Sequence, residues 1–309
     1  MGDILTTGGV FRDADRKQVV ANICSVFGCE ETDIENLVPV QSGLSNVVLV
    51  FDLNGGKYIY RHPGLGSDEL VNRGRETFMQ AIASETGIDG TLIAIDVAEG
   101  WRIGKFVEHR PFDYHDLNDM VRAMLLFRRL HSAPCKARWN FDVIKKSEQI
   151  KLSIPDKDYG NFDRFYEIKE RIYKLNELTK LDGIRKCFIH GDARDDNFLI
   201  NDDEIYLIDW EYAGYGDPGF DLGSYICGGE HTREEVDRSL YTYFGGKPDL
   251  KQRRHFYAYI AITGYFYLHW TMLKESKGQM VGFLKNQWYK NALEYSEMAL
   301  KLYEENDKK

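Results

Sequence analysis

Three oxygen-bearing side chains stand at fixed intervals in residues 190–211, which read HGDARDDNFLINDDEIYLIDWE. Asn197 follows Asp192 after five positions, and Asp209 comes twelve positions later. Phosphoryl transfer needs a carboxylate beside the attacking hydroxyl, and oxygen ligands for the magnesium ions that neutralise the phosphates. The spacing therefore predicts phosphoryl transfer, with Asp192 at the hydroxyl and with Asn197 and Asp209 as magnesium ligands.

The elements around these residues must bring the three side chains together. Short apolar runs at residues 198–200 and 205–208 flank a polar turn, which predicts a hairpin between Asn197 and Asp209. Two loop side chains and one strand-end side chain can then converge at one end of that hairpin. The alternative is that the polar residues merely cap turns. The combination of spacing and hairpin disfavours this alternative.

The N-terminal part of the sequence has the pattern of an antiparallel sheet with one main helix. Strand-forming residues dominate from residue 38 onward, and Asn54-Gly55-Gly56 is a hairpin signal. The expected elements are a helix at 14–28, a short turn at 33–37 that leads into a strand, a helix at 68–86, and strands at 91–96 and 101–107.

The C-terminal part is mostly helical. Apolar residues recur at helical spacing in AMLLFRRLH, and further long helices are expected at 160–180, 232–244, 251–276 and 282–305. We expect the boundary near residues 106–109, which gives an N-terminal lobe at 1–107 and a C-terminal lobe at 108–309. The fold class is α+β, with strands concentrated in the first lobe.

Composition limits the classes of partner. The 309 residues, 43% of them hydrophobic, suffice for two packed cores at about 150 residues per domain. The net charge is -9, and there is no run of basic residues that could follow a phosphate backbone, which disfavours nucleic acid as a partner. The sequence does not determine the oligomeric state.

The cysteines and the longest uncharged stretch bear on the protein's environment. Five scattered cysteines without a C-x-x-C pair, and a start that lacks the features of a signal peptide, favour a reducing, cytoplasmic setting. Residues 256–273 are uncharged and approach the length of a bilayer span, but they contain four tyrosines and His269. Such polar groups favour a buried helix beside a pocket over a membrane span.

The segments HGDARDDNFLI and LIDWEYAGYGDPGFDLG resemble the choline/ethanolamine kinase family, in its bacterial choline-kinase-like branch. That family belongs to the protein-kinase-like fold, which also contains aminoglycoside phosphotransferases. The resemblance implies a two-lobed kinase fold, ATP and Mg²⁺ as cosubstrates, and an amino-alcohol acceptor. It implies that Asp192 is the catalytic base, that Asn197 and Asp209 bind the metal, and that Asp221 braces the catalytic loop. Gly191 stands where protein kinases usually have an arginine.

The nucleotide half of the site is expected in the N-terminal lobe. A polar turn that resembles the family's G-L-S-N turn would contact phosphate, and its candidate residues are Ser42, Gly43, Ser45 and Asn46. By resemblance, Arg61 would bind phosphate, with Glu76 as the helix residue that orients it. Arg73 and Arg75 are competitors for the role of Arg61. The alternatives are an ordinary hairpin turn and surface charges.

The adenine contact is also assigned by resemblance. Phe106 and Val107 stand where backbone groups of the family face adenine. Glu211, in the I-D-W-E-Y segment, either holds the catalytic loop or faces the acceptor, and the sequence does not decide between these roles.

Aromatic side chains are the expected walls of the acceptor site. A quaternary ammonium forms no ordinary hydrogen bond, so aromatic faces hold it, each contributing about 0.5–2 kcal/mol. Tyr267 and Trp270 lie three positions apart, on one face of a helix, and Tyr289 resembles a further wall. The alternative is that these rings belong to the core. Choline kinases commonly have a glutamate where this chain has Gly228, and Glu230 is a candidate substitute.

These observations predict a kinase that uses ATP and Mg²⁺ to phosphorylate the hydroxyl of choline. Ethanolamine, another amino alcohol, thiamine and an aminoglycoside remain alternative acceptors. An inactive kinase-fold protein that binds a ligand or acts as a scaffold is the alternative of another class.

Overall fold

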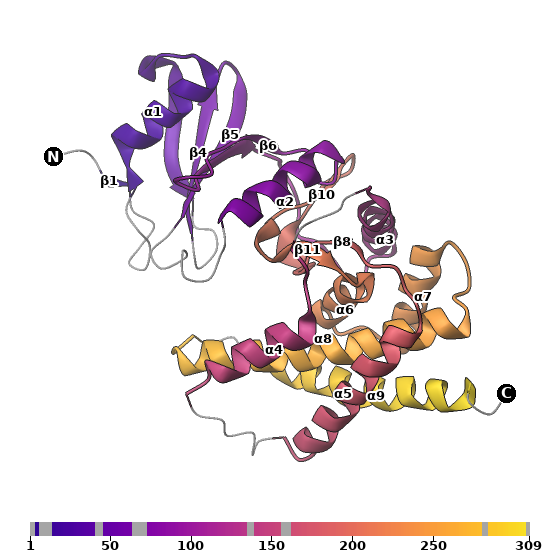
Figure 1. Cartoon of the computed structure of the whole chain (residues 1–309). Coiled ribbons are helices and arrows are strands. Elements are labelled where there is room, and N and C mark those ends of the chain that lie inside the picture. The colour runs from indigo at the N-terminus through magenta and orange to yellow at the C-terminus, as the bar shows by residue number, and fades with distance from the viewer. Residues whose placement is uncertain are drawn as a thin grey trace. The chain divides into compact units, whose positions relative to one another are not determined.

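The computed structural model describes residues 4–5, 14–40, 46–63, 73–134, 139–155, 162–279 and 284–306. Its contacts divide the chain into two compact units (Figure 1). The first unit comprises Met1–Arg110 and Tyr206–Tyr212, and the second comprises Pro111–Ile205 and Ala213–Lys309. The division into lobes at 1–107 and 108–309 stays a prediction.

The first unit is built on a five-stranded antiparallel sheet with the strand order β3-β4-β5-β7-β6. The antiparallel sheet predicted for this part of the chain is confirmed. Its strands are β3 (Ile34–Val40), β4 (Asn46–Leu53), β5 (Gly56–Pro63), β6 (Leu92–Ile95) and β7 (Arg102–Lys105), and its helices are α1 (Arg16–Phe27), η1 (Glu31–Asp33) and α2 (Arg73–Glu85). A separate short pair, β1 (Ile4–Leu5) and β2 (Ala14–Asp15), precedes α1.

The core of the first unit follows from the alternation of side chains in β4. Every second residue from Val47 to Leu53 lies on one face of the sheet and is almost fully buried. Val19 and Ile23 of α1 pack against the same face. Asn54 and Gly55 form the turn from β4 to β5 with φ angles of 51° and 76°, which is why an Asn-Gly pair stands there.

Two of the expected boundaries in this unit differ from the structure. Residues 34–37 are already part of β3, which starts directly after η1, so the predicted turn at 33–37 is wrong beyond Asp33. A short 3-10 turn with a capping box at Glu30 accounts for the change of direction. Residues 68–72 of the predicted helix at 68–86 lie outside the described residues.

The second unit is mainly helical, as predicted. Its helices are α3 (Leu117–Ser132), α4 (Val143–Leu152), α5 (Phe165–Leu181), α6 (Pro218–Gly228), α7 (Arg233–Phe244), α8 (Leu250–Ser276) and α9 (Lys285–Asn306). Its shorter elements are β8 (Cys187–Ile189), η3 (Asp195–Asn197), β9 (Phe198–Ile200) and β11 (Gly214–Gly216). Between β9 and β11 the chain forms β10 (Ile205–Leu207) and η4 (Trp210–Tyr212), and Tyr206–Tyr212 of this stretch belong to the first unit. The predicted hairpin is confirmed, because β9 and β10 form a two-stranded sheet.

Helix α8 is the central element of the second unit and packs against α4, α5, α6 and α9 (Figure 1). Sixteen of its residues are buried, so the stretch at 256–273 is a core helix rather than an amphipathic one. Small residues allow its closest contacts. A Cβ atom at Gly264 would lie 2.7 Å from the carbonyl oxygen of Trp288 in α9, and one at Gly223 of α6 would lie 2.4 Å from Oγ1 of Thr263.

Helix α4 was not expected from the sequence, and α6 was implied only by the resemblance, as the helix that carries Asp221. The α6 segment, PGFDLGSYICG, contains three glycines, which disfavour an isolated helix. Asp217 caps its start by accepting from the amide of Gly219, and its buried glycines fit against α8. Tertiary packing therefore compensates for poor intrinsic propensity in α6.

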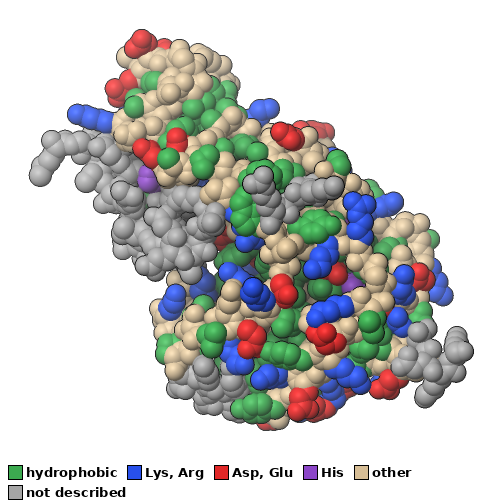
Figure 2. Space-filling model, viewed as in Figure 1, with side chains coloured by type: hydrophobic (Ala, Val, Ile, Leu, Met, Phe, Trp, Pro, Cys, Tyr) green, Lys and Arg blue, Asp and Glu red, His purple; other side chains and the backbone are tan. Residues whose placement is uncertain are grey.

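The surface of the second unit is charged, and the helices bear on whether the chain could span a membrane. Figure 2 shows lysine and arginine side chains interspersed with aspartate and glutamate over the helices of the second unit. Within the described parts of the chain, no helix combines the length and apolar character needed to cross a bilayer.

Candidate active site

The backbone that leads into Asp192 is held by a buried aspartate. The amides of His190 and Gly191 donate to the carboxylate of Asp221, each at 2.8 Å. Nε2 of His131 lies 3.0 Å from the same carboxylate, which is fully buried. Asp221 belongs to α6, so the geometry has the bracing contact that the resemblance implied.

Gly191 has a conformational reason to be glycine. Its φ angle is 85°, in the left-handed region that side-chain-bearing residues rarely adopt. An arginine at this position, as in protein kinases, would be strained in this loop.

Asp192 and Asn197 are joined at the two ends of the catalytic loop. Nδ2 of Asn197 donates to the carbonyl oxygen of Asp192 at 2.7 Å and lies 3.4 Å from its carboxylate oxygen Oδ2. Because an amide donates only through its nitrogen, this orientation leaves Oδ1 of Asn197 as the atom that could act as a metal ligand. The structure thus brings together these two predicted residues.

A group of aromatic rings borders the other oxygen of Asp192. The hydroxyl of Tyr267 donates to Oδ1 of Asp192 at 3.3 Å and lies 2.5 Å from the hydroxyl of Ser224. The ring of Tyr267 lies 5.0 Å from that of Trp288, and Trp270 meets Trp288 edge-on at 6.4 Å. Burial holds the pKa of Tyr267 well above its usual value, so its hydroxyl remains a donor.

Tyr289 lies elsewhere in the second unit. Its ring stacks on Phe162 at 4.7 Å, and its hydroxyl accepts from the backbone amide of Arg164 at 3.3 Å. Trp288, which was not among the predicted residues, contacts Tyr267 instead. A sequence signal for this exists, because the buried residues of α9 recur at helical spacing as Trp288, Ala292, Tyr295, Ala299 and Tyr303.

Two arginines and two carboxylates form a compact network in the first unit. The guanidinium of Arg61 donates to both carboxylate oxygens of Asp209 at 3.2–3.3 Å. Arg102 is the cross-strand neighbour of Arg61 and lies 3.7 Å from Asp209. Nη2 of Arg102 also pairs with Glu76 at 2.8 Å. No sequence motif marks Arg102, and its alignment with Arg61 becomes visible once the strand register is known.

The charges of this network determine the pKa values of its arginines. Burial alone would lower the pKa of Arg61, but the carboxylates of Asp209 and Glu76 outweigh it and raise that pKa. The pKa of Arg102 is lowered by burial and then by the charge of Arg61. Glu76 was predicted to orient Arg61. It forms its ion pair with Arg102 and acts on Arg61 through its charge, so the predicted orienting role stays a prediction.

Asp209 adopts an unusual backbone conformation. Its φ angle is 70°, in the left-handed region, although it carries a side chain. Such a conformation costs about 1 kcal/mol or more, and residues held in it cluster at functional sites. The bend turns the chain from β10 into η4, where Glu211 follows and adds its charge to the environment of Arg61.

The remaining predicted nucleotide residues are only partly described. Ser42, Gly43 and Ser45 lie outside the described residues, and Asn46 is the first residue of β4. The amide of Phe106 donates to the carbonyl of Lys57 at 3.0 Å, while the carbonyl of Val107 lies 2.8 Å from Nδ1 of His109. Two of the backbone groups expected to face adenine therefore already have partners within the first unit.

Glu230 is exposed in the turn after α6. It has no hydrogen bond or ion pair with another described residue, and its charge acts on His115. Its assignment to the acceptor remains a prediction.

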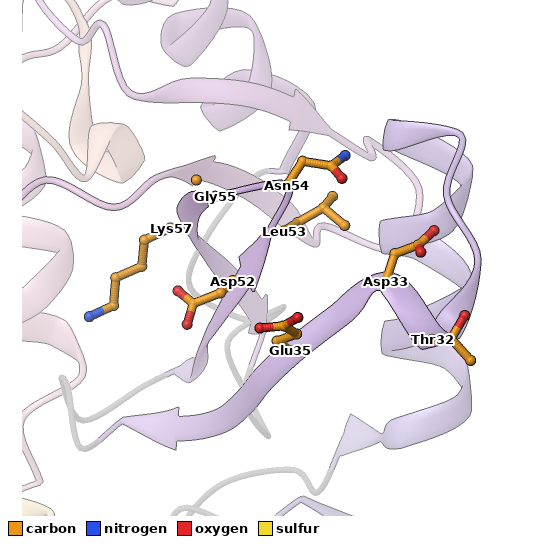
Figure 3. Close-up of a pocket in the computed structure, with 9 residues that line it drawn as sticks. Thr32, Asp33, Glu35, Asp52, Leu53, Asn54, Gly55 and Lys57 are labelled. Atoms are coloured by element: carbon orange, nitrogen blue, oxygen red, sulfur yellow. The ribbon is translucent and has the colours of Figure 1, made fainter.

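A cavity of about 510 Å³ opens elsewhere on the first unit (Figure 3). Glu35 and Asp52, which are cross-strand partners, project beside one another there, whereas Lys57 points away from them. None of the residues that line this cavity is among the predicted site residues.

The chain has a unit built on an antiparallel sheet and a mainly helical unit, and a buried aspartate braces its His-Gly-Asp loop. This is the fold of the protein-kinase-like phosphotransferases. The family model described as choline/ethanolamine kinase matches residues 37–263. The chain belongs to this family, and it is a phosphotransferase that acts on an alcohol group.

Three relatives illustrate the similarity. Protein LicA of Haemophilus influenzae is 26% identical over 285 residues, which cover 88% of this chain and 81% of LicA. The crystal structure of choline kinase LicA from Streptococcus pneumoniae superposes with a TM-score of 0.72 at 19% identity, over 91% of this chain and 98% of that one. A structure of LicA in complex with AMP gives a TM-score of 0.72 at 20% identity, over 92% and 98% of the two chains.

Proposed function

We propose that this protein transfers the γ-phosphoryl group of ATP to the hydroxyl of choline, giving phosphocholine and ADP. The observation that carries the proposal is the position of Asp192 between the loop residue Asn197 and the ring cluster of Tyr267, Trp288 and Trp270. A carboxylate that can take a hydroxyl proton thus lies beside a ring cluster in which Tyr267 and Trp288 are buried and Trp270 is partly exposed. We propose that this cluster forms the aromatic wall for the ammonium.

In the proposed reaction, Asp192 orients the acceptor hydroxyl and accepts its proton. The acceptor oxygen forms its bond to the γ-phosphorus as the bond from that phosphorus to the bridging oxygen of ADP breaks. The hydrogen bonds from Asn197 to Asp192, and from the loop amides to Asp221, keep the carboxylate in place during this exchange.

The donor atoms of this chain fit magnesium, which prefers oxygen ligands. Within the described residues, no three histidine, cysteine, aspartate or glutamate side chains form a metal cluster. We propose that Oδ1 of Asn197 and the carboxylate of Asp209 are the protein ligands, since Mg²⁺ in kinases is held by few protein groups together with phosphates. When bound, the metal neutralises charge on the phosphates. Arg61 is the proposed phosphate contact of the first unit.

The test is a screen of purified protein with Mg-ATP against choline, ethanolamine, thiamine and an aminoglycoside, with products identified by ³¹P NMR. We expect phosphocholine as the main product. Asp192→Asn should lower turnover by about 10²–10⁴-fold if Asp192 is a general base. Asp203→Asn makes the same chemical change on the exposed hairpin turn and should retain turnover.

Each other outcome has a defined meaning. Absence of turnover with millimolar choline would refute choline as the acceptor, and turnover with another compound would identify the alternative. Near-normal turnover by Asp192→Asn would refute the role of Asp192. Absence of Mg-ATP binding by calorimetry would support the inactive binding protein instead.

A further inference from the structure

The end of α6 leaves no room for side chains. A Cβ atom built at Gly228 would lie 2.0 Å from the hydroxyl oxygen of Tyr114 and 2.7 Å from its Cζ. At Gly229, a Cβ atom would lie 2.8 Å from Cγ of the same ring. Contacts below 3.0 Å are essentially absent for real Cβ atoms. The tyrosine therefore occupies the space that a side chain at position 228 would need.

Tyr114 is held firmly in that place. Its hydroxyl accepts from the backbone amide of Asp195 at 2.8 Å, three residues after the proposed base. Its ring meets Tyr225, His231 and Phe112 edge-on, at centroid distances of 5.2–5.4 Å. The ring cannot turn aside without breaking this packing. Tyr114 thus connects the catalytic loop to the end of α6.

The last turn of α6 also borders the ring cluster of the proposed acceptor site. Ser224 shares a short hydrogen bond with Tyr267, and the carbonyl of Cys227 accepts from the indole of Trp288 at 2.7 Å. Position 228 follows directly. The helix end between Trp288 and Tyr114 therefore adjoins the rings next to Asp192.

The carboxylates of Asp192, Asp195 and Asp196 and the guanidinium of Arg194 all act near this helix end. Arg194 lies in the catalytic loop, 2.8 Å from Asp196, with most of its side chain buried. Its burial would lower its pKa, but the charges of Asp192 and Asp196 raise it. Tyr267 and Tyr114 both lie within the range of its charge. A permanent guanidinium thus offsets part of the attraction that Asp192 exerts on an ammonium.

We propose that Tyr114 is a specificity-determining residue of the acceptor site. Tyr114 fills the space that a side chain at position 228 would need, so a neutral hydroxyl lies where a glutamate on α6 could otherwise place a carboxylate. The absence of that negative charge weakens the preference for a cationic acceptor over an uncharged one. This inference rests on the proposed function. Aromatic faces then supply most of the recognition of the ammonium.

The experiment compares choline with 3,3-dimethylbutan-1-ol, which has the same shape but a carbon in place of the charged nitrogen. The ratio of kcat/KM for the two acceptors is measured for wild type, Tyr114→Ala, Tyr114→Ala/Gly228→Glu, and Tyr114→Ala/Gly228→Gln. We expect the glutamate double variant to raise the ratio about 10-fold over Tyr114→Ala, since a carboxylate favours only the cation. The glutamine variant has the same size without the charge and should not raise it.

Circular dichroism and thermal unfolding establish that each variant is folded. If the glutamate variant does not fold, acetate is added to Tyr114→Ala, whose vacated space can admit a small carboxylate. Acetate should then raise the ratio for Tyr114→Ala but not for wild type. An unchanged ratio in the folded glutamate variant, or under acetate, overturns the proposal.

The outcome is separable from that of the proposed function. Wild-type protein that phosphorylates no amino alcohol refutes the proposed function. If the wild type phosphorylates choline but the ratio of kcat/KM does not change in the glutamate variant or with acetate, only the role of Tyr114 is refuted. If the screen selects another amino alcohol, that compound and its carbon isostere replace the choline pair.

Discussion

Substitutions of Arg102 and Glu76, which form an ion pair, should have strongly coupled effects on the free energy of unfolding. Its N···O distance is 2.8 Å, and the two side chains are 12% and 13% exposed. Removing one partner of a buried pair typically costs about 3–5 kcal/mol, because the other charge remains buried. We expect the low end, about 3 kcal/mol, for Arg102→Met, because a tenth of each side chain still reaches water.

Substitution of the other partner, Glu76, should lower the free energy of unfolding by less. In Glu76→Gln, Arg102 keeps its hydrogen bond to Gln80 at 2.9 Å and its proximity to Asp209. We expect a loss of about 2 kcal/mol for this variant. Once both charges are gone, neither is left unpaired, and the double variant should lose about 3 kcal/mol rather than the summed 5. The predicted coupling is about 2 kcal/mol.

Urea unfolding followed by hydrogen exchange of β5 and β7 peptides reports on the first unit separately from the helices. The matched control is the pair Arg238 and Glu234 of α7, which has an N···O distance of 2.7 Å but is 46% and 81% exposed. Its coupling should be about 0.5 kcal/mol or less. If the double variant of Arg102 and Glu76 loses as much unfolding free energy as the two single variants together, the reasoning is refuted.

Three further outcomes are expected. Asp221→Asn removes a buried charge that accepts from two loop amides, and should lower both turnover and the unfolding free energy, the latter by about 2–4 kcal/mol in urea titrations. Burial would lower the pKa of His255, but Asp182 and Asp217 raise it. The stabilisation that protonated His255 contributes is therefore complete below about pH 6.5, and it is lost as the pH rises through the raised pKa of this residue. The difference in unfolding free energy between wild type and His255→Gln should therefore shrink from about pH 6 to about pH 9. Burial lowers the pKa of His269 to about 4. Wild type should therefore lose up to about 3 kcal/mol between pH 6.5 and 4 through this group, a loss that His269→Gln should lack.

The catalytic loop could be predicted from the sequence because its parts are close together along the chain. The hairpin of β9 and β10 is specified by apolar runs and turn residues. The helical unit was likewise predicted from apolar residues at helical spacing. Local spacing suffices where backbone geometry alone determines which side chains meet.

The sequence was less informative where tertiary packing overrides local preference. Helix α6 has three glycines and no helical pattern, yet packing against α8 makes it a helix. The same helix supplies Asp221, so the brace of the catalytic loop depends on an element that propensity does not predict. Tyr289, assigned to the acceptor site by resemblance, lies on the face of α9 that meets Phe162.

The sequence by itself predicted phosphoryl transfer from the spacing of Asp192, Asn197 and Asp209 within one short segment, and the family match confirms a phosphotransferase. The roles of the three residues stay predictions. Only the tertiary structure identified Arg102 as the partner of Glu76, and Tyr114 as the residue that fills the space at Gly228. Both pairs join segments far apart in the sequence. Glu76 lies on helix α2 and Arg102 on strand β7, while Tyr114 meets the end of α6. Each contact depends on how separate elements pack, and no periodicity or motif encodes a contact of that kind.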